Sequence, residues 1–188
     1  MHTTLIRLTL ALLLSWGLAA TDAPAAPALA GPCLITSVGQ SSDIVIVKAL
    51  LNTQLKMGFD VKPTVQAGEL GQIGTLLIVV GSSAKGLGAA GIDMPKEMQR
   101  ARALIDAAHQ RKASILVMHT GGEARRGKTS NDLIDLVVPE ADRVVVVASG
   151  NQDKHFNTLA AGRQIPVIEV GKLAEAGQAV KALFDASR

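Results

Sequence analysis

The feature that most constrains this chain is the alternation of short apolar runs with longer segments of helical periodicity. Most of the apolar runs carry hydrophobic residues at consecutive positions, as strands buried on both faces of a parallel sheet do. The predicted strands are residues 33–38, 60–65, 75–80, 114–119, 143–148 and 165–170, of which 60–65 is the weakest. The alternation predicts an α/β fold.

The segments between the predicted strands carry apolar residues at helical spacing. In residues 43–57, the side chains of Ile44, Val47 and Leu51 share one face of a helix, and Ser42 before them is a natural N-cap. Further helices are predicted at residues 94–112, 130–138, 152–161 and 173–184. Each helix therefore has one apolar face that can cover the sheet.

Right-handed crossovers between such strands produce a three-layer, doubly wound parallel sheet. We expect about five strands and, from the size of the chain, a flavodoxin-like order of 2-1-3-4-5. Ligands of such sheets bind beyond the carboxyl ends of the strands, near the switch point between the first and third strands. The loops to examine are therefore residues 39–42, 81–91, 120–129 and 150–154.

The amino-terminal segment predicts export. Arg7 is followed by an apolar run of about 13 residues, too short for a membrane anchor, and then by a stretch rich in alanine and proline. We expect residues 1–30 to be a signal peptide cut after Ala30, with cuts after Ala20 or Ala23 as alternatives. The mature protein, residues 31–188, is then one α/β domain of about 158 residues in the periplasm or the medium.

Composition excludes several classes of partner. Aromatic residues make up 2% of the 188 residues, with no tyrosine, so stacking on nucleic-acid bases or a flavin is not expected. The net charge of +3 favours anions slightly. Cys33 is the one cysteine, which excludes an internal disulfide, and Pro32 before it disfavours lipidation. No His/Cys cluster has metal spacing, so we expect neither a metal nor a cofactor.

The loops after the first and third predicted strands carry hydroxyl groups. Ser41 and Ser42 either donate hydrogen bonds to an anion at the start of the next helix or merely cap that helix. Ser82, Ser83 and Lys85 begin a glycine-rich segment that we interpret as a loop closing over a ligand, with a merely flexible loop as the alternative. Its G-x-G-x-x-G match is not in the first β–α turn, so a dinucleotide site is not predicted.

The loop after the fourth predicted strand contains three cations, Arg125, Arg126 and Lys128, beside Gly121 and Gly122. Residues 122–129 match a P-loop, but neither neighbouring strand ends in the acidic residue that would hold magnesium, and an exported protein has no ATP. Arginine suits carboxylates and phosphates, and the glycines allow the backbone to approach them. We therefore predict an anion site, the alternative being surface ion pairs.

Two residues of the same loop could transfer protons. His119 lies at the predicted strand end and could act as a general acid or base, although a lone histidine is more often structural. Glu123 could serve as a base or could orient an arginine. No Ser-His-Asp order or G-x-S-x-G motif accompanies them, so these are candidates for catalysis only.

The four strand-end segments also support a resemblance. LITSVGQSSD (34–43), VVGSSAKGLGAAGID (79–93), MHTGGEARRGKTSNDLID (118–135) and VVASGNQDKHF (146–156) resemble a family of exported bacterial proteins known only as a domain of unknown function. The similarity spans residues 33–184 and departs from the pattern at Lys128 and Thr129. It implies a secreted α/β domain and transfers no catalytic residue.

These features together predict an exported binding or accessory protein that holds a small anionic ligand at the strand ends. The alternative is a small exported hydrolase or transferase that acts on an anionic substrate. Because binding proteins usually enclose their ligand between two lobes, a single domain of this size needs a partner, either a membrane protein or a second copy.

Overall fold

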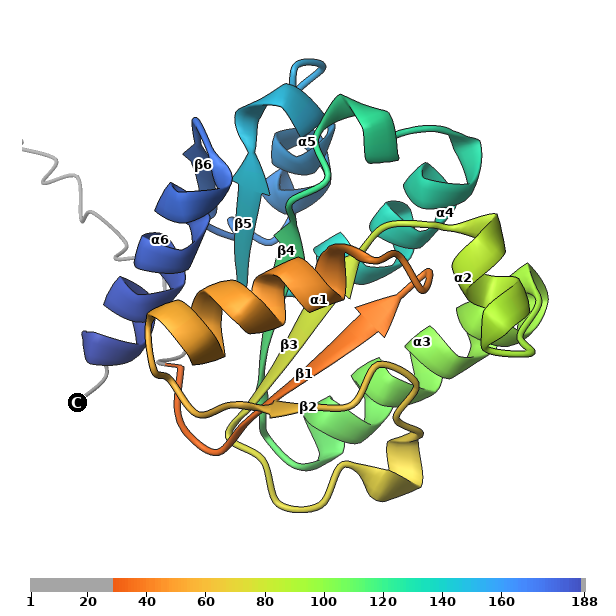
Figure 1. Ribbon diagram of the computed structural model, residues 1–188, viewed down its shortest axis with the longest axis horizontal. Coiled ribbons are helices and arrows are strands. Elements are labelled where there is room, and N and C mark those ends of the chain that lie inside the picture. The colour runs from red at the N-terminus through yellow and green to blue at the C-terminus, as the bar shows by residue number, and fades with distance from the viewer. Residues whose placement is uncertain (1–28, 187–188) are drawn as a thin grey trace, which may run out of the picture.

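The structure, a computed structural model that describes residues 29–186, contains one six-stranded sheet with the order β2-β1-β3-β4-β5-β6 (Figure 1). All five strand pairs are parallel. The strands are β1 (Cys33–Val38), β2 (Asp60–Val61), β3 (Thr75–Val80), β4 (Ser114–His119), β5 (Arg143–Val147) and β6 (Val167–Val170). The predicted flavodoxin-like order is confirmed, with a sixth strand added beside β5.

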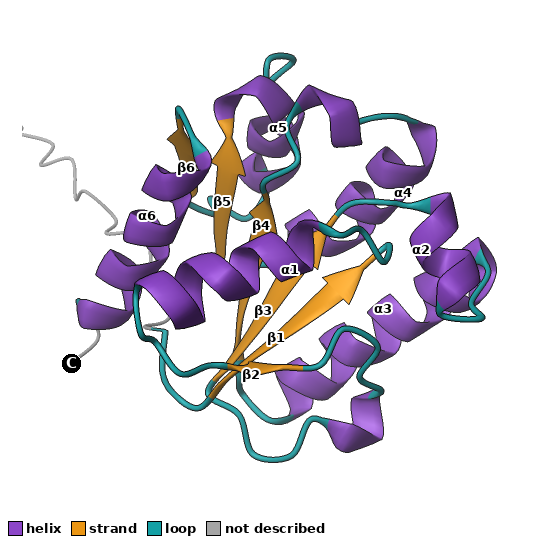
Figure 2. Ribbon diagram, viewed as in Figure 1, coloured by secondary structure: helices purple, strands orange, loops and turns teal. Residues whose placement is uncertain are grey.

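Helices cover both faces of the sheet (Figure 2). The α-helices are α1 (Asp43–Lys48), α2 (Ala84–Ala89), α3 (Met94–Gln110), α4 (Lys128–Val137), α5 (His155–Ala161) and α6 (Leu173–Asp185). One core lies between the sheet and α3, α4 and α5, and the other lies between the sheet and α1 and α6. Within residues 29–186, no helix has both the length and the hydropathy needed to cross a membrane.

Neighbouring strand residues point into different cores, as the pleat requires. Leu34 packs under α3 and α4, whereas Ile35 packs under α1 and α6, and both are fully or almost fully buried. The same alternation holds along β3, where Leu76 and Leu77 face opposite cores. Consecutive apolar residues in these strands are thus explained by burial on both faces.

Two predicted elements differ from the structure because of local hydrogen bonding. The predicted helix 43–57 is α-helical only to Lys48 and continues as a π-helix over Ala49–Gln54. The predicted strand 60–65 is only the two-residue β2, because Pro63 has no N–H to donate to the ladder. The Pro63 carbonyl instead accepts hydrogen bonds from the Ser37 N–H and the Thr36 hydroxyl.

The predicted glycine-rich loop 81–91 contains the helix α2, so the segment is not a loop throughout, and its closing over a ligand stays a prediction. The Ser83 hydroxyl caps this helix by accepting a hydrogen bond from the Gly86 N–H at 3.1 Å. Gly86 packs directly on the Gln40 carbonyl, where any Cβ would collide with the oxygen. The glycine at position 86 therefore serves helix packing.

The predicted signal peptide falls mostly on residues 1–28, which lie outside the described residues. Leu29 and Ala30, which a cut after Ala30 would remove, are part of the fold. Leu29 is 2% exposed in the core under α1 and α6, and Ala30 exchanges two hydrogen bonds with the Thr75 hydroxyl at 3.1 and 2.7 Å. Cuts after Ala20 or Ala23 would leave these contacts intact.

We therefore expect a chain that begins at Gly31 to be less stable than a chain that begins at residue 24. The loss should be about 2 kcal/mol in the free energy of unfolding, the value of one fully buried leucine side chain. Urea denaturation of both chains measures it, and Leu29→Ala in the longer chain separates the side chain from the Ala30 hydrogen bonds. Equal midpoints for all three proteins would show that these contacts contribute nothing.

Candidate functional site

The carboxyl ends of β1, β3 and β4 meet at one edge of the sheet, where their loops are joined by hydrogen bonds. Gln40 and Ser82 form an isolated antiparallel bridge between the first two loops. The Ser82 N–H also donates to the Ser130 hydroxyl of α4 at 2.9 Å, and the Ser83 N–H donates to the Gly39 carbonyl at 2.8 Å. The loops predicted to form a site are therefore adjacent in space.

Arg125 joins the loop after β4 to the start of α1. Its Nη2 donates to the Ser42 hydroxyl at 3.1 Å, and its Nε lies 3.6 Å from Oδ1 of Asp43. The Arg125 side chain is 32% exposed, whereas that of Asp43 is 7% exposed. Nη1 of Arg125 makes no hydrogen bond within residues 29–186, so it has donors left on a side chain that is partly exposed.

The prediction did not include Asp43, which the structure places beneath Arg125. Its Oδ2 is buried and has no hydrogen-bond partner among the described residues, and the same is true of the Thr120 hydroxyl. Buried polar atoms without partners are uncommon and often mark functional sites. Sequence reasoning missed Asp43 because its position in the first turn of a helix is ordinary for an aspartate.

Gly121 is the point where the loop passes closest to this pair. A Cβ at Gly121 would lie 2.6 Å from the Arg125 Cβ and 2.6 Å from Oδ2 of Asp43. Gly121 thus lets the backbone approach the chain's own side chains, and its predicted approach to a ligand stays a prediction. Ser41 is buried nearby and accepts a hydrogen bond from the Asp43 N–H at 3.1 Å, so it supports the turn into α1.

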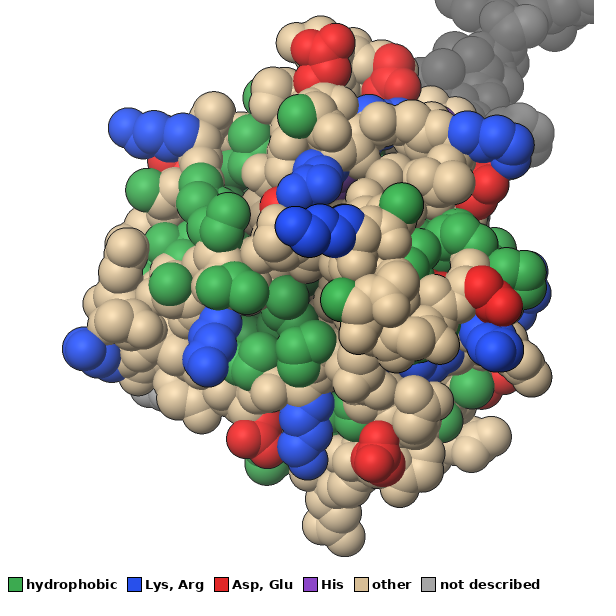
Figure 3. Space-filling model, turned by 45° about the vertical axis from the view of Figure 1, so that its right-hand side comes forward, with side chains coloured by type: hydrophobic (Ala, Val, Ile, Leu, Met, Phe, Trp, Pro, Cys, Tyr) green, Lys and Arg blue, Asp and Glu red, His purple; other side chains and the backbone are tan. Residues whose placement is uncertain are grey.

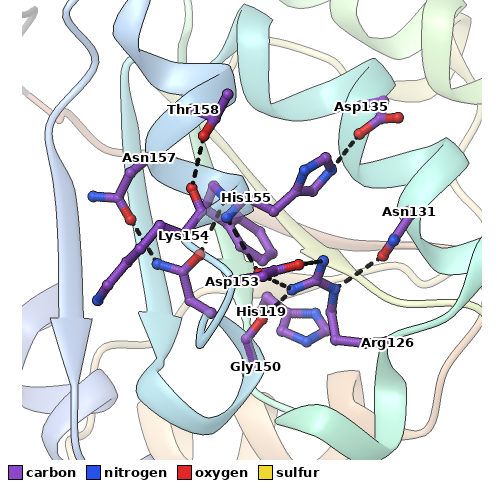
Figure 4. A network of polar contacts seen from close by, with 12 residues as sticks. His119, Arg126, Asn131, Asp135, Gly150, Asp153, Lys154, His155, Asn157 and Thr158 are labelled. Atoms are coloured by element: carbon purple, nitrogen blue, oxygen red, sulfur yellow. Dashed lines mark hydrogen bonds and ion pairs between the residues drawn. The ribbon is translucent and has the colours of Figure 1, made fainter.

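Arg126, the neighbour of Arg125, has different partners and donates hydrogen bonds from all three of its guanidinium nitrogens (Figure 4). It binds both carboxylate oxygens of Asp153, at 3.1 and 2.9 Å, the Gly150 carbonyl at 2.5 Å and the Asn131 side chain at 2.9 Å. Its guanidinium also lies 5.6 Å from the centre of the Phe156 ring. The hydrogen bonds from Arg126 hold the pKa of Asp153 below its usual value. Arg126 therefore fastens the loop to α4, α5 and the β5 end.

A cavity of about 240 Å³ lies beside Arg126. It is lined by Glu123, Arg126, Asn131, Ser149, Gly150, Gln152 and Asp153. The carboxylates of Glu123 and Asp153 in this lining repel an anion, and Arg126 already binds Asp153. The cavity is therefore a poor place for an anionic ligand.

His119 is fully buried, with both ring nitrogens directed at backbone carbonyls. Nδ1 lies 3.0 Å from the Val80 oxygen and Nε2 lies 3.2 Å from the Gly122 oxygen. Burial lowers the pKa of His119 below its usual value, although the two carbonyls oppose the shift. With neither nitrogen facing solvent or the Arg125 guanidinium, this geometry suits a residue that holds the Gly122 turn in place.

The remaining predicted site residues lie around this centre. Lys128 is exposed and binds the Asp132 carboxylate one helical turn further along α4, at 2.9 Å. Lys85 is exposed on α2 and makes no ion pair within residues 29–186. Gly122 adopts a positive φ of 60°, which lets the chain turn toward Glu123. Among the described residues, no group of three potential metal ligands comes together.

The fold and the strand-end site define a flavodoxin-like α/β domain with a candidate ligand site at the carboxyl edge of its parallel sheet. The chain belongs to the family described as "Domain of unknown function (DUF6305)", which matches residues 30–184. The match confirms the resemblance to a family of unknown function. A search of curated proteins finds no match to the chain.

Proposed function

We propose that this protein binds a small anion through Arg125 at the carboxyl ends of β1 and β4. The observation that carries the proposal is the guanidinium itself, which Ser42 and Asp43 hold in place while Nη1 has no hydrogen-bond partner in the described part of the chain. Two further hydrogen bonds from an arginine to a carboxylate or phosphate are geometrically favourable and charge-assisted. The buried Asp43 orients the guanidinium and leaves its outer edge to the ligand.

The other two cations of the loop are less suited to this role. All three guanidinium nitrogens of Arg126 donate hydrogen bonds to groups of the protein. A ligand that replaced these hydrogen bonds would lower the stability of the fold. Lys128 is 85% exposed and pairs with Asp132, so it is hydrated and weakly held. Of the three cations, Arg125 is thus the one proposed to bind the ligand, Arg126 stabilises the loop, and Lys128 lies on the surface.

We also propose that the protein is exported and acts as a binding or accessory protein outside the cytoplasm. The apolar run after Arg7 supports this, as does the family match, which begins at residue 30 and so leaves out all but the last residue of the predicted leader. Arg125 lies on an open surface, so a membrane protein or a second subunit would complete the enclosure of the ligand. Recovery of the processed chain from the periplasm tests the location.

The binding proposal is tested by replacing each cation singly with glutamine. Calorimetric titration with acetate and with inorganic phosphate should show binding to the wild type, and Arg125→Gln should weaken it at least tenfold. The physical reason is the loss of the guanidinium edge that faces the ligand. Thermal unfolding of each variant without ligand measures stability separately.

Lys128→Gln is the matched control, since it removes the same charge from the same loop and should change affinity less than twofold. Arg126→Gln should lower the melting temperature, because it leaves the Gly150 carbonyl and Asp153 without their partner. Equal weakening by Arg125→Gln and Lys128→Gln would mean that only net charge matters and would refute a site at Arg125.

A further inference from the structure

Two large aliphatic side chains of α1 are exposed to solvent, whereas the other large hydrophobic side chains of residues 29–186 are buried or partly buried. Val45 is 65% exposed and Ile46 is 46% exposed, and no other large hydrophobic side chain in residues 29–186 is exposed to this degree. A single exposed aliphatic residue is ordinary on a protein surface. Val45 and Ile46, however, are adjacent and lie on the helix whose N-cap residue, Ser42, binds the Arg125 guanidinium.

Helical geometry places this aliphatic pair next to Arg125. The first turn of α1 begins at Ser42, whose carbonyl accepts the Val45 N–H at 3.0 Å. Val45 and Ile46 follow Ser42 by three and four residues, so all three share one face of the helix. Because the Ser42 hydroxyl holds the Arg125 guanidinium, the cation lies at the end of that face. In Figure 3, which is turned by 45° from the view of Figure 1, basic side chains lie next to patches of hydrophobic surface.

The opposite face of the same helix packs against the sheet and α6. Ile44 and Val47 are buried in the core under α1 and α6, so Val45 and Ile46 are not needed for that packing. A ligand that touches both the cation and the aliphatic pair would remove apolar surface from water as well as neutralise the charge. Such a ligand has an anionic head and an apolar chain attached to it.

We propose that the ligand of Arg125 is an amphipathic carboxylate, whose head group binds the guanidinium and whose alkyl chain lies over Val45 and Ile46. This inference rests on the proposed anion site and specifies the class of molecule that it takes. The positive charge of Arg125 requires an anionic head group. Val45 and Ile46 lie one helical turn beyond Ser42, so an alkyl chain needs several methylenes to reach across them.

The test is a series of straight-chain carboxylates, from acetate through butanoate and hexanoate to octanoate, titrated calorimetrically below the concentration at which micelles form. Affinity should rise about twofold for each added methylene, since a methylene covered on one side gains roughly half the free energy of complete burial. Octylamine, which has the same chain with a positive head group, should not bind.

The double variant Val45→Ser/Ile46→Ser should keep the affinity for acetate and lose most of the dependence on chain length. Arg125→Gln should weaken every member of the series. Equal affinity for acetate and octanoate in the wild type would overturn the amphipathic ligand and leave the anion site standing. A chain-length dependence that survives the double variant would overturn it too, whereas no binding of any carboxylate or of phosphate would refute the anion site itself.

Discussion

Arg100→Met should lower the free energy of unfolding by about 3–5 kcal/mol, the cost of leaving one partner of a buried ion pair without the other. Arg100 and Glu97 of α3 are 4% and 0% exposed and lie 2.8 Å apart. Arg100 also donates to the Val65 carbonyl at 2.9 Å and to the Ser37 carbonyl at the end of β1. The substitution leaves these acceptors and a buried carboxylate unpaired, and urea denaturation measures the loss.

Lys96→Met is the matched control, because Lys96 is in the same helix and makes an exposed ion pair with Asp93 at 3.9 Å. It should cost less than about 1 kcal/mol, as exposed pairs do. If Arg100→Met costs no more than Lys96→Met, the buried pair does not stabilise the strand end.

Acidification offers a second readout of the same pair. Burial raises the pKa of Glu97, but the hydrogen bonds from Arg100 and from the Gly39 N–H outweigh it, so the pKa lies below its usual value of 4.5. A carboxylate whose pKa is lower in the folded state contributes to stability. The contribution is complete at pH values above the unfolded-state pKa and is lost as the pH falls through the folded-state pKa. Glu97→Gln should therefore flatten the dependence of stability on pH below about 4.5.

Gly39→Ala should lower the free energy of unfolding by about 3–4 kcal/mol, because backbone strain and overpacking act together at this position. Gly39 has a φ of 99°, which side chains rarely tolerate. A Cβ there would lie 2.7 Å from the Gly81 carbonyl carbon and 2.8 Å from Cδ1 of Leu133. Since the Gly39 N–H donates to Glu97 at 2.7 Å, any shift of this residue also disturbs the buried ion pair.

Gly58→Ala separates the two causes, since Gly58 has a positive φ of 66° but nothing within 4 Å of its hypothetical Cβ. It carries the conformational penalty alone and should cost only about 1 kcal/mol. Denaturation of both variants under the same conditions gives the comparison. Equal losses would show that the crowding at Gly39 is relieved without cost.

The sheet was predictable from the sequence because each central strand is apolar on both faces. TLLIVV at residues 75–80 and RVVVVA at 143–148 cannot form amphipathic helices, and the structure has strands at 75–80 and 143–147. The sequence does not predict the helix α2, because its two glycines oppose helix formation locally, while its packing on Gln40 depends on a residue far away in the chain. The predicted strand 60–65 is longer than β2 because Pro63, which cannot donate to the ladder, stops the pairing.

The candidate site was less predictable, because charged side chains take their roles from distant partners. The sequence does not distinguish the cations of this loop, yet their partners differ. Arg125 binds the start of α1, Arg126 binds α4 and the segment between β5 and α5, and Lys128 binds α4. Asp43 and Glu97 carried no recognisable motif. Their importance arises only when the sheet brings the ends of β1, β3 and β4 together.

The bonds of Arg126 also bear on how binding proceeds in time. Because Asn131, Gly150 and Asp153 already fix the loop, its conformational entropy is lost during folding and need not be lost again when a ligand arrives. A ligand should then meet a rigid surface and associate in a single kinetic phase, without a slower step of loop ordering. Differences in affinity among ligands should consequently come from the rate of departure more than from the rate of arrival.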